Sequence, residues 1–303
     1  MKFLRLLLIV IVSLSFAGCE KTTNQNNPTL IINTSPGTKP WTHLQFYNDP
    51  DNFQFVILSD RTGDHVPGLY EKTVDKVNLM MPEFVICVGD LIEGKTKDND
   101  RLKAEWHEFD AIVNQLKMPF FYMPGNHDIS NKTMAKFWKD RYGDSYYHFI
   151  YKHTLFLCLN SEDQAIGSNI SDEQLNYFKN IIQSNPDVRW TLVFLHKPMW
   201  TYPKKPGYDN FKKLQSLLAD RPHTFFAGHK HRYGKDIINN RNYYILSTNK
   251  DGVQSIPDCR IDHFMWVTMT QDGPRIANIL VEGVLDDEPC PKSSQSGNDH
   301  SDY

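Results

Sequence analysis

The sequence contains no Cys-x-x-Cys pair, no excess of basic charge and no apolar run long enough to cross a bilayer as an ordinary helix. The missing Cys-x-x-Cys pair excludes a zinc finger and a thioredoxin-like redox site. Because 33 basic residues face 36 acidic ones, for a formal charge of -3, no basic field attracts nucleic acid. We therefore expect no nucleic-acid partner.

Cysteine is scarce, with five residues in 303. Cys87 and Cys158 lie inside apolar, strand-like runs and are predicted to be inert core thiols. Cys259 and Cys290 are available to pair in an oxidising compartment, but spacing alone does not establish a disulfide.

The first 18 residues have the pattern of a targeting segment. Lys2 and Arg5 give a positive start, Leu6–Leu14 is a short apolar stretch, and a small Ala-Gly pair follows. Since Cys19 comes next, the segment is similar to a bacterial lipoprotein signal, in which Cys19 is lipidated after cleavage. A plain secretory signal with an incidental cysteine is the alternative. Both place the mature protein outside the cytoplasm, and the first predicts a lipid anchor to a bacterial membrane, in the periplasm or at the cell surface.

The rest of the chain divides into three parts by composition. Residues 19–50 are rich in Asn, Thr and Pro and are predicted to be a tether. Residues 51–283 form one continuous domain, and the polar residues 284–303 are predicted to be a disordered tail.

Within the domain, apolar runs typical of strands alternate with apolar residues at helical spacing. The predicted strands are Phe53–Leu58, Phe84–Val88, Phe120–Met123, Thr154–Asn160, Thr191–Leu195, Phe225–Phe226, Tyr243–Leu246, Met265–Met269 and Ile276–Val281. The predicted helices lie at about 70–81, 102–116, 175–182 and 211–218, the third opened by a capping box from Ser171 to Gln174. This alternation predicts an α/β layered domain. Two of the strands lack helices beside them, which indicates a partly antiparallel or mixed sheet.

Polar side chains follow five of the apolar runs, at the point where each strand ends. They are Asp60, Asp90, the Asn126-His127-Asp128 triplet, His196, and the pair His229 and His231. One such residue would be a turn or cap, but open α/β sheets place ligands at the carboxyl ends of their strands. Carboxylate, amide and imidazole donors without thiolate suit Mn, Fe, Co or Zn. Two such ions about 3.5–4 Å apart can share a carboxylate and clamp a phosphoryl group.

The motifs at these positions resemble the calcineurin-like metallophosphoesterase superfamily over about residues 53–281. They are Gly89-Asp90, Gly-Asn-His-Asp at 125–128, the isolated His196, and Gly-His-x-His at 228–231, in this order. The resemblance implies an α-β-β-α sandwich of mixed β-sheets flanked by helices. It also implies two bound metal ions and hydrolysis of a small phosphoester by a metal-activated hydroxide.

The resemblance further implies a role for each residue. Asp90 would bridge both metals, and His127 would contact the phosphate and act on the leaving oxygen. The remaining ligands would be Asn126, His196 and His229 for the second metal, and Asp60 and His231 for the first. Asp128 would either orient His127 or cap a helix at Ile129.

Thr62 departs from the superfamily pattern, in which the first motif is usually Asp-x-His and the histidine binds the first metal. His65, Glu93 or water could replace it, and we favour His65 as a site residue that binds metal or substrate. Arg61 and Arg232 adjoin proposed ligands and could pair with phosphate oxygens, with Arg61 favoured because it lies in the loop itself.

Three functions fit these residues. The leading prediction is a lipid-anchored, extracytoplasmic hydrolase of phosphomonoesters or phosphodiesters. The second is a hydrolase of the same type directed at nucleotides or phospholipid headgroups. The third is a surface domain that binds metal or phosphate with little catalysis.

Overall fold

The computed structural model describes residues 41–43, 49–63, 66–163, 169–248, 259–281 and 283–285. The predictions for residues 1–18, Cys19, His65 and Cys290 lie outside the described residues. The chain divides into two units, Met1–Asp49 and Pro50–Tyr303, and every helix and strand below belongs to the second.

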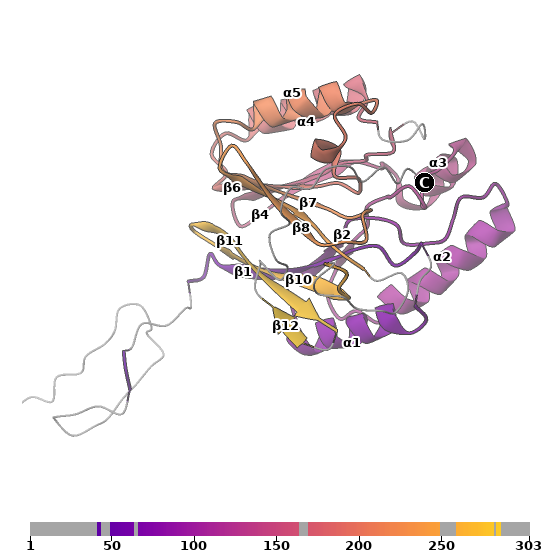
Figure 1. Ribbon diagram of the computed structural model, residues 1–303, viewed down its shortest axis with the longest axis horizontal. Helices are drawn as coiled ribbons and strands as arrows, with labels where there is room; N and C mark the ends of the chain where they lie inside the picture. The colour runs from indigo at the N-terminus through magenta and orange to yellow at the C-terminus, as the bar shows by residue number, and fades with distance from the viewer. Residues whose placement is uncertain are drawn as a thin grey trace, which may run out of the picture. The chain divides into compact units, whose positions relative to one another are not determined.

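Two six-stranded sheets form the centre of this unit (Figure 1). The first has the order β12-β11-β10-β1-β2-β3, and the second has the order β4-β5-β6-β7-β9-β8. The first sheet consists of β1 (Phe53–Leu58), β2 (Phe84–Cys87), β3 (Phe120–Phe121), β10 (His263–Thr270), β11 (Gly273–Leu280) and β12 (Gly283–Leu285). The second consists of β4 (Tyr147–Tyr151), β5 (Thr154–Cys158), β6 (Trp190–Phe194), β7 (His223–Ala227), β8 (Gly234–Ile238) and β9 (Arg241–Ile245). Both sheets mix parallel and antiparallel pairs, as predicted.

Helices cover the outer face of each sheet (Figure 1). α1 (Leu69–Met80) and α2 (Asn99–Val113) lie against the first sheet, and α4 (Asp172–Ser184) and α5 (Tyr208–Leu217) lie against the second. α3 (Lys132–Tyr142) and the short 3-10 helix η2 (Met199–Thr201) lie in connections. The predicted α-β-β-α sandwich is therefore confirmed. No helix in the described ranges has the length and apolarity that a membrane crossing requires.

The central strands are apolar throughout because both of their faces are buried. In β5, Phe156 and Cys158 belong to the core between the two sheets, whereas Leu155 and Leu157 belong to the core beneath α4 and α5. Phe156 is the centre of an aromatic cluster, with its ring centroid 5.5 Å from that of Phe55 in the opposite sheet. This packing fixes the two sheets against each other, and with them the loops at their strand ends.

The sequence correctly predicted the start of α4 but placed the end of the domain too early. Ser171 Oγ accepts a hydrogen bond from the backbone N–H of Gln174 (3.1 Å), which confirms the predicted cap of α4. The prediction of an unstructured tail from residue 284 is wrong at its start. β12 pairs with β11 as far as Leu285, because the backbone hydrogen bonds at the β11 edge of the first sheet continue after the turn between β11 and β12.

Candidate active site

Asp60, two residues beyond β1, joins the two sheets at their strand ends. Its carboxylate is 1% exposed and accepts a hydrogen bond from the neighbouring Ser59 hydroxyl. Its Oδ1 also accepts from the backbone N–H of His229, beyond β7 (2.9 Å). A buried carboxylate thus bridges a loop of each sheet.

Asp90 lies in a sharp turn after β2. Gly89 has φ +94° and Asp90 has φ +58°, so two consecutive residues occupy the left-handed region. Asp90 Oδ1 accepts from the backbone N–H of His127 (2.7 Å), and a Cβ added to Gly125 would lie 2.2 Å from that oxygen. The two glycines therefore allow the loops after β2 and β3 to approach closely enough to aim the Asp90 carboxylate.

His196 Nε2 is the point where four potential ligand atoms meet. It lies 3.1 Å from Asp90 Oδ2, 3.1 Å from Asn126 Oδ1 and 3.2 Å from His229 Nδ1. The imidazole is fully buried, and its Nδ1 donates to the carbonyl of Val88 (2.9 Å). This hydrogen bond fixes the ring with Nε2 facing the other three atoms.

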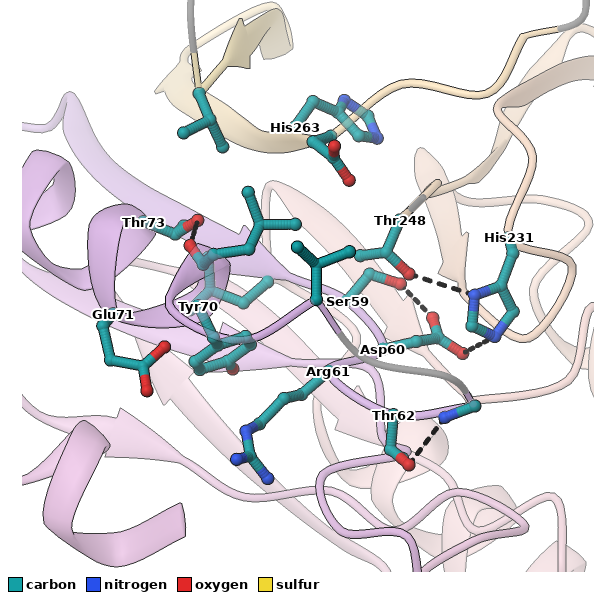
Figure 2. A pocket seen from close by; sticks show the side chains of 16 residues that line it. Ser59, Asp60, Arg61, Thr62, Tyr70, Glu71, Thr73, His231, Thr248 and His263 are labelled. Carbon is teal, nitrogen blue, oxygen red and sulfur yellow. Dashed lines mark hydrogen bonds and ion pairs between the residues drawn. The ribbon is translucent and has the colours of Figure 1, made fainter. Parts of the chain in front are cut away.

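Asp60, Asp90 and His231 form a second group, whose ligand atoms all lie within 4.8 Å of one another. His231 Nε2 lies 3.6 Å from Asp60 Oδ1, and its Nδ1 lies 3.2 Å from the Thr248 hydroxyl (Figure 2). Asp90 is common to both groups. The structure therefore brings together the six strand-end residues that the family resemblance implies as ligands.

Electrostatics at the site follow from burial and close contact. Burial alone would raise the pKa of Asp90, but His196 beside it and the His127 N–H lower that pKa well below its usual range. Burial would lower the pKa of His196, but Asp90 and Asp60 raise it to about 9. Burial and the charge of His196 lower the pKa of His229. Asp90 is thus ionised, and the protonated His196 ring provides the positive charge that a bound cation would otherwise supply.

The donor set suits a metal ion. With Nδ1 donating to Val88 and the pKa of the ring raised, a proton on Nε2 lies between that nitrogen and the acceptor oxygens of Asp90 and Asn126, and a metal ion could take its place. Facing acceptors repel one another unless a proton or a cation lies among them. Mixed oxygen and nitrogen donors are typical ligands of divalent transition metals and zinc.

His127 is held at the edge of the site. Its Nδ1 lies 2.8 Å from the carbonyl oxygen of Glu93, which can only accept, so Nδ1 carries the hydrogen. Nε2 is then the atom available to a ligand. Glu93, one predicted replacement for the missing histidine, thus contributes its backbone carbonyl to positioning His127.

Asp128 has neither of its two predicted contacts. Its carboxylate accepts four backbone N–H groups, from Asp90 (2.7 Å), Gly125 (2.8 Å), Leu91 (2.9 Å) and Ile92 (3.2 Å). The contact of His127 Nδ1 is with Glu93 instead. The next helix, α3, is capped by Asn131. The prediction that Asp128 orients His127 or caps a helix is wrong, because four amides left unpaired by the two tight turns converge on this carboxylate.

Arg61 is directed elsewhere than predicted. Its side chain is 6% exposed and forms an ion pair with Glu108 of α2, and its Nη1 lies 3.4 Å from the Leu91 carbonyl. Figure 2 shows the guanidinium pointing away from Asp60 and His231. The structure therefore gives Arg61 a role in fixing the loop to α2, in place of the predicted substrate contact.

Thr62 lies in the position usual for the first-motif histidine. It is buried, and its hydroxyl accepts from the Gly63 N–H (2.6 Å). Thr62 lines a cavity together with the polar residues Asp60 and His231 (Figure 2) and the apolar residues Leu69 and Val281. His65 lies outside the described residues, so its predicted role stays a prediction.

Two charged residues near the site were missed by sequence analysis. Lys197, directly after His196, forms an ion pair with Glu162 (2.8 Å). The available signal was the position of Lys197 at the end of a strand. Trp200, in η2 after Lys197, packs against Phe225 and Tyr243 and donates to Asp236 (2.8 Å).

A sandwich of two mixed sheets, with carboxylate, amide and imidazole donors gathered at its strand ends, defines the class of metal-dependent hydrolases. Residues 53–233 match the calcineurin-like phosphoesterase family, and the chain belongs to this family. The protein is therefore a metallophosphoesterase.

Proteins with similar sequences include a phosphodiesterase and a protein phosphatase. The chain is 25% identical over 232 residues to the 3',5'-cyclic adenosine monophosphate phosphodiesterase CpdA of Haemophilus influenzae, covering 73% of this chain and 81% of that protein. It is 28% identical over 196 residues to the human serine/threonine-protein phosphatase CPPED1, covering 54% of this chain and 59% of that protein.

Solved structures support the fold. A dimetal phosphatase from Danio rerio superposes with a TM-score of 0.60 at 14% identity, covering 77% of this chain and 98% of that one. A purple acid phosphatase from yellow lupin superposes with a TM-score of 0.59 at 13% identity, covering 81% of this chain and 57% of that one.

Proposed function

We propose that the protein hydrolyses small phosphomonoesters or phosphodiesters with two metal ions, drawn from Mn, Fe, Zn and Co, outside the cytoplasm. The observation that carries this proposal is the meeting of Asp90, Asn126 and His229 ligand atoms within 3.2 Å of His196 Nε2. Asp60 and His231 supply a second set that shares Asp90.

The chain's own groups have distinct tasks in this proposal. Asp90, Asn126, His196 and His229 would hold one ion, and Asp60, Asp90 and His231 would hold the other. When bound, the metals supply an activated water nucleophile and charge neutralisation at the phosphoryl group. His127, with Nδ1 fixed on the Glu93 carbonyl, presents Nε2 to the leaving oxygen and protonates it. Asp128 keeps the loops of Asp90 and Gly125 in place.

The substrate is a phosphoester with a small organic group, and a nucleotide is supported by the CpdA relative. A phospholipid headgroup is the alternative for a membrane-anchored enzyme. A surface domain with little turnover fits less well, because the chain retains His127 and all the predicted second-metal ligands.

Asp90→Asn tests the proposal. We expect wild-type protein loaded with Mn²⁺ or Zn²⁺ to hydrolyse p-nitrophenyl phosphate, bis(p-nitrophenyl) phosphate or cyclic AMP. Asp90→Asn should lower kcat/KM by about 100-fold or more, because both metal sets lose their shared carboxylate. Elemental analysis of the same samples should give two metals per chain in wild type and fewer in the variant.

The exposed Asp144, paired with Lys139, provides a matched Asp→Asn control that should leave activity unchanged. A wild-type protein that binds metal and hydrolyses none of the three esters would contradict the proposed function.

For the location, we propose that lipidated Cys19 anchors the protein to a bacterial membrane, facing the periplasm or the cell exterior. The support is the Lys2–Cys19 segment with its short apolar stretch. Wild-type protein expressed in bacteria with labelled palmitate should carry label and sediment with membranes. Cys19→Ser should carry no label and remain uncleaved or be released. Unlabelled wild-type protein in the soluble fraction would refute the anchor.

A further inference from the structure

Lys197 and Glu162 form a buried ion pair beside the proposed ligands, outside the ligand set itself. Lys197 follows His196 beyond β6, and its Nζ lies 2.8 Å from Glu162 Oε1. The two side chains are only 12% and 3% exposed. Each side chain therefore lies against an oppositely charged partner in a place where little water reaches either one.

The loop that carries Glu162 is fixed by a polar network. Gln174, fully buried on α4, accepts from the Asn160 N–H and donates to the Asn160 carbonyl, both at 2.9 Å. The Asn160 side chain accepts from the Glu162 N–H (2.8 Å), and Ser161 Oγ accepts from the Lys197 N–H (3.0 Å). Both partners of the ion pair are therefore anchored through their backbones.

Stability alone does not explain this arrangement. A buried ion pair contributes little net stability compared with apolar side chains of similar volume, because both charges lose their hydration. Glu162 also lies close enough to Asp90 for the two negative charges to interact. Placing the Glu162 carboxylate beside an anionic site is unfavourable by itself. We therefore expect the Lys197 ammonium, which Glu162 holds, to have a function at the site.

The pair lies next to the proposed ligands. The Lys197 charge helps to lower the pKa of His229, after burial and the charge of His196. A second lysine also lies near His229, since Lys230 Nζ is 4.4 Å from the Tyr202 ring centroid and that ring is 6.3 Å from the His229 ring. Both lysine charges act on His229, so positive charge lies beside the proposed ligands, as an anionic substrate requires.

We propose that Lys197 is a substrate-binding residue whose ammonium, positioned by Glu162, binds a non-bridging oxygen of the substrate phosphoryl group. The inference rests on the proposed function, since it takes a phosphoester as the ligand. A lysine binds phosphate as a point charge, so it favours a doubly charged phosphomonoester over a singly charged phosphodiester. Lys197 would thus determine which ester class the enzyme prefers.

Binding of inorganic phosphate to the Mn²⁺-loaded full-length chain in detergent tests this without turnover. By calorimetry, Lys197→Met should weaken phosphate binding about 10-fold or more, the loss of one charge-assisted hydrogen bond. Lys197→Arg should recover much of the affinity. Glu162→Gln, which removes the positioning carboxylate, should give an intermediate loss. Metal content should stay at the wild-type value in all three.

Lys136, paired with Asp140 on the exposed face of α3, provides a matched control, and Lys136→Met should bind phosphate as wild type does. KM for p-nitrophenyl phosphate should rise more in Lys197→Met than KM for bis(p-nitrophenyl) phosphate. If Lys197→Met does not fold, Lys197→Arg and Glu162→Gln still test the proposal. Unchanged phosphate affinity in Glu162→Gln would argue against the positioning of the Lys197 ammonium by Glu162. Equal phosphate affinity in wild type and Lys197→Met overturns the proposal, as does a wild type that binds no phosphate. A different outcome would separate the two proposals. If the wild-type protein binds phosphate through Lys197 but hydrolyses neither ester, only the proposed function is contradicted.

Discussion

The carboxylate of Asp128 connects two loops that carry proposed metal ligands. Its oxygens accept backbone N–H groups from Asp90 and Leu91 after β2 and from Gly125 after β3. A carboxylate is suited to this position because it accepts at both oxygens. Asp128 therefore acts on the site through the backbone of Asp90.

Asp128→Asn should destabilise the protein and weaken metal binding together. The amide group would face at least one backbone N–H that needs an acceptor, at a cost of about 1–3 kcal/mol. Because the Asp90 loop loses its support, metal affinity should fall by about 10–100-fold. Urea denaturation and metal titration measure the two effects. Asp144→Asn on the surface is the control for charge removal, and wild-type metal affinity in Asp128→Asn would refute the positioning role.

Arg61 and Thr62 illustrate a limit of motif analysis for single residues. Both residues follow Asp60 in the sequence, but their side chains point in different directions. Arg61 reaches Glu108, which is 47 residues away in the chain. Strand-end position indicated correctly that this loop contributes to the site. It did not indicate which side chains of the loop turn inward.

At the scale of elements, the turn after β2 controls the geometry of Asp90. Gly89 has φ +94°, and a Cβ added there would lie 2.6 Å from the Gly125 backbone nitrogen. A side chain would therefore force apart the loops after β2 and β3. Gly68, before α1, has a similar φ of +81° with nothing within 4 Å of an added Cβ.

These two glycines make a matched pair for substitution. Gly68→Ala should cost about 1 kcal/mol from its backbone conformation alone. Gly89→Ala should cost roughly 2–4 kcal/mol and should also reduce metal content, because Asp90 moves with the turn. Denaturant titration and elemental analysis provide the two readouts. Equal effects of the two substitutions on both readouts would show that loop separation does not control the site.

Elements buried on both faces were predicted best. The runs that became β1, β2, β5 and β6 are almost wholly buried, so their composition alone is distinctive. β4 and β8 were missed because they are edge strands with partly exposed residues. The helix α3 was also missed, since few of its side chains are buried.

For the whole molecule, the candidate centre lies where the two sheets meet. Asp60, Asp90 and Asn126 follow strands of the first sheet, and His196 and His229 follow strands of the second. Bound metals would therefore link the two halves of the sandwich. Ligands that bind only the folded state stabilise it by mass action.

Metal removal should consequently lower the melting temperature. With free metal at about 100 times Kd, binding contributes about 2.7 kcal/mol, which corresponds to roughly 5–10 °C for a domain of this size. Thermal melts with added Zn²⁺ and with EDTA measure the difference. Asp90→Asn should show a much smaller difference. An identical melting temperature with metal and with EDTA in wild type would argue that the loops form no linking centre.

The sequence by itself determined the α/β layering, the order of the strand-end motifs and the set of residues that meet at the site. These follow from signals of short range, namely apolar periodicity and the residues directly after each strand. Tertiary structure alone decided that Asp128 binds four amides, that Arg61 pairs with Glu108, and that Lys197 pairs with Glu162. Apart from the Gly125 contact of Asp128, each of these contacts joins residues distant in the chain. Such partners depend on which loops the packed sheets bring together.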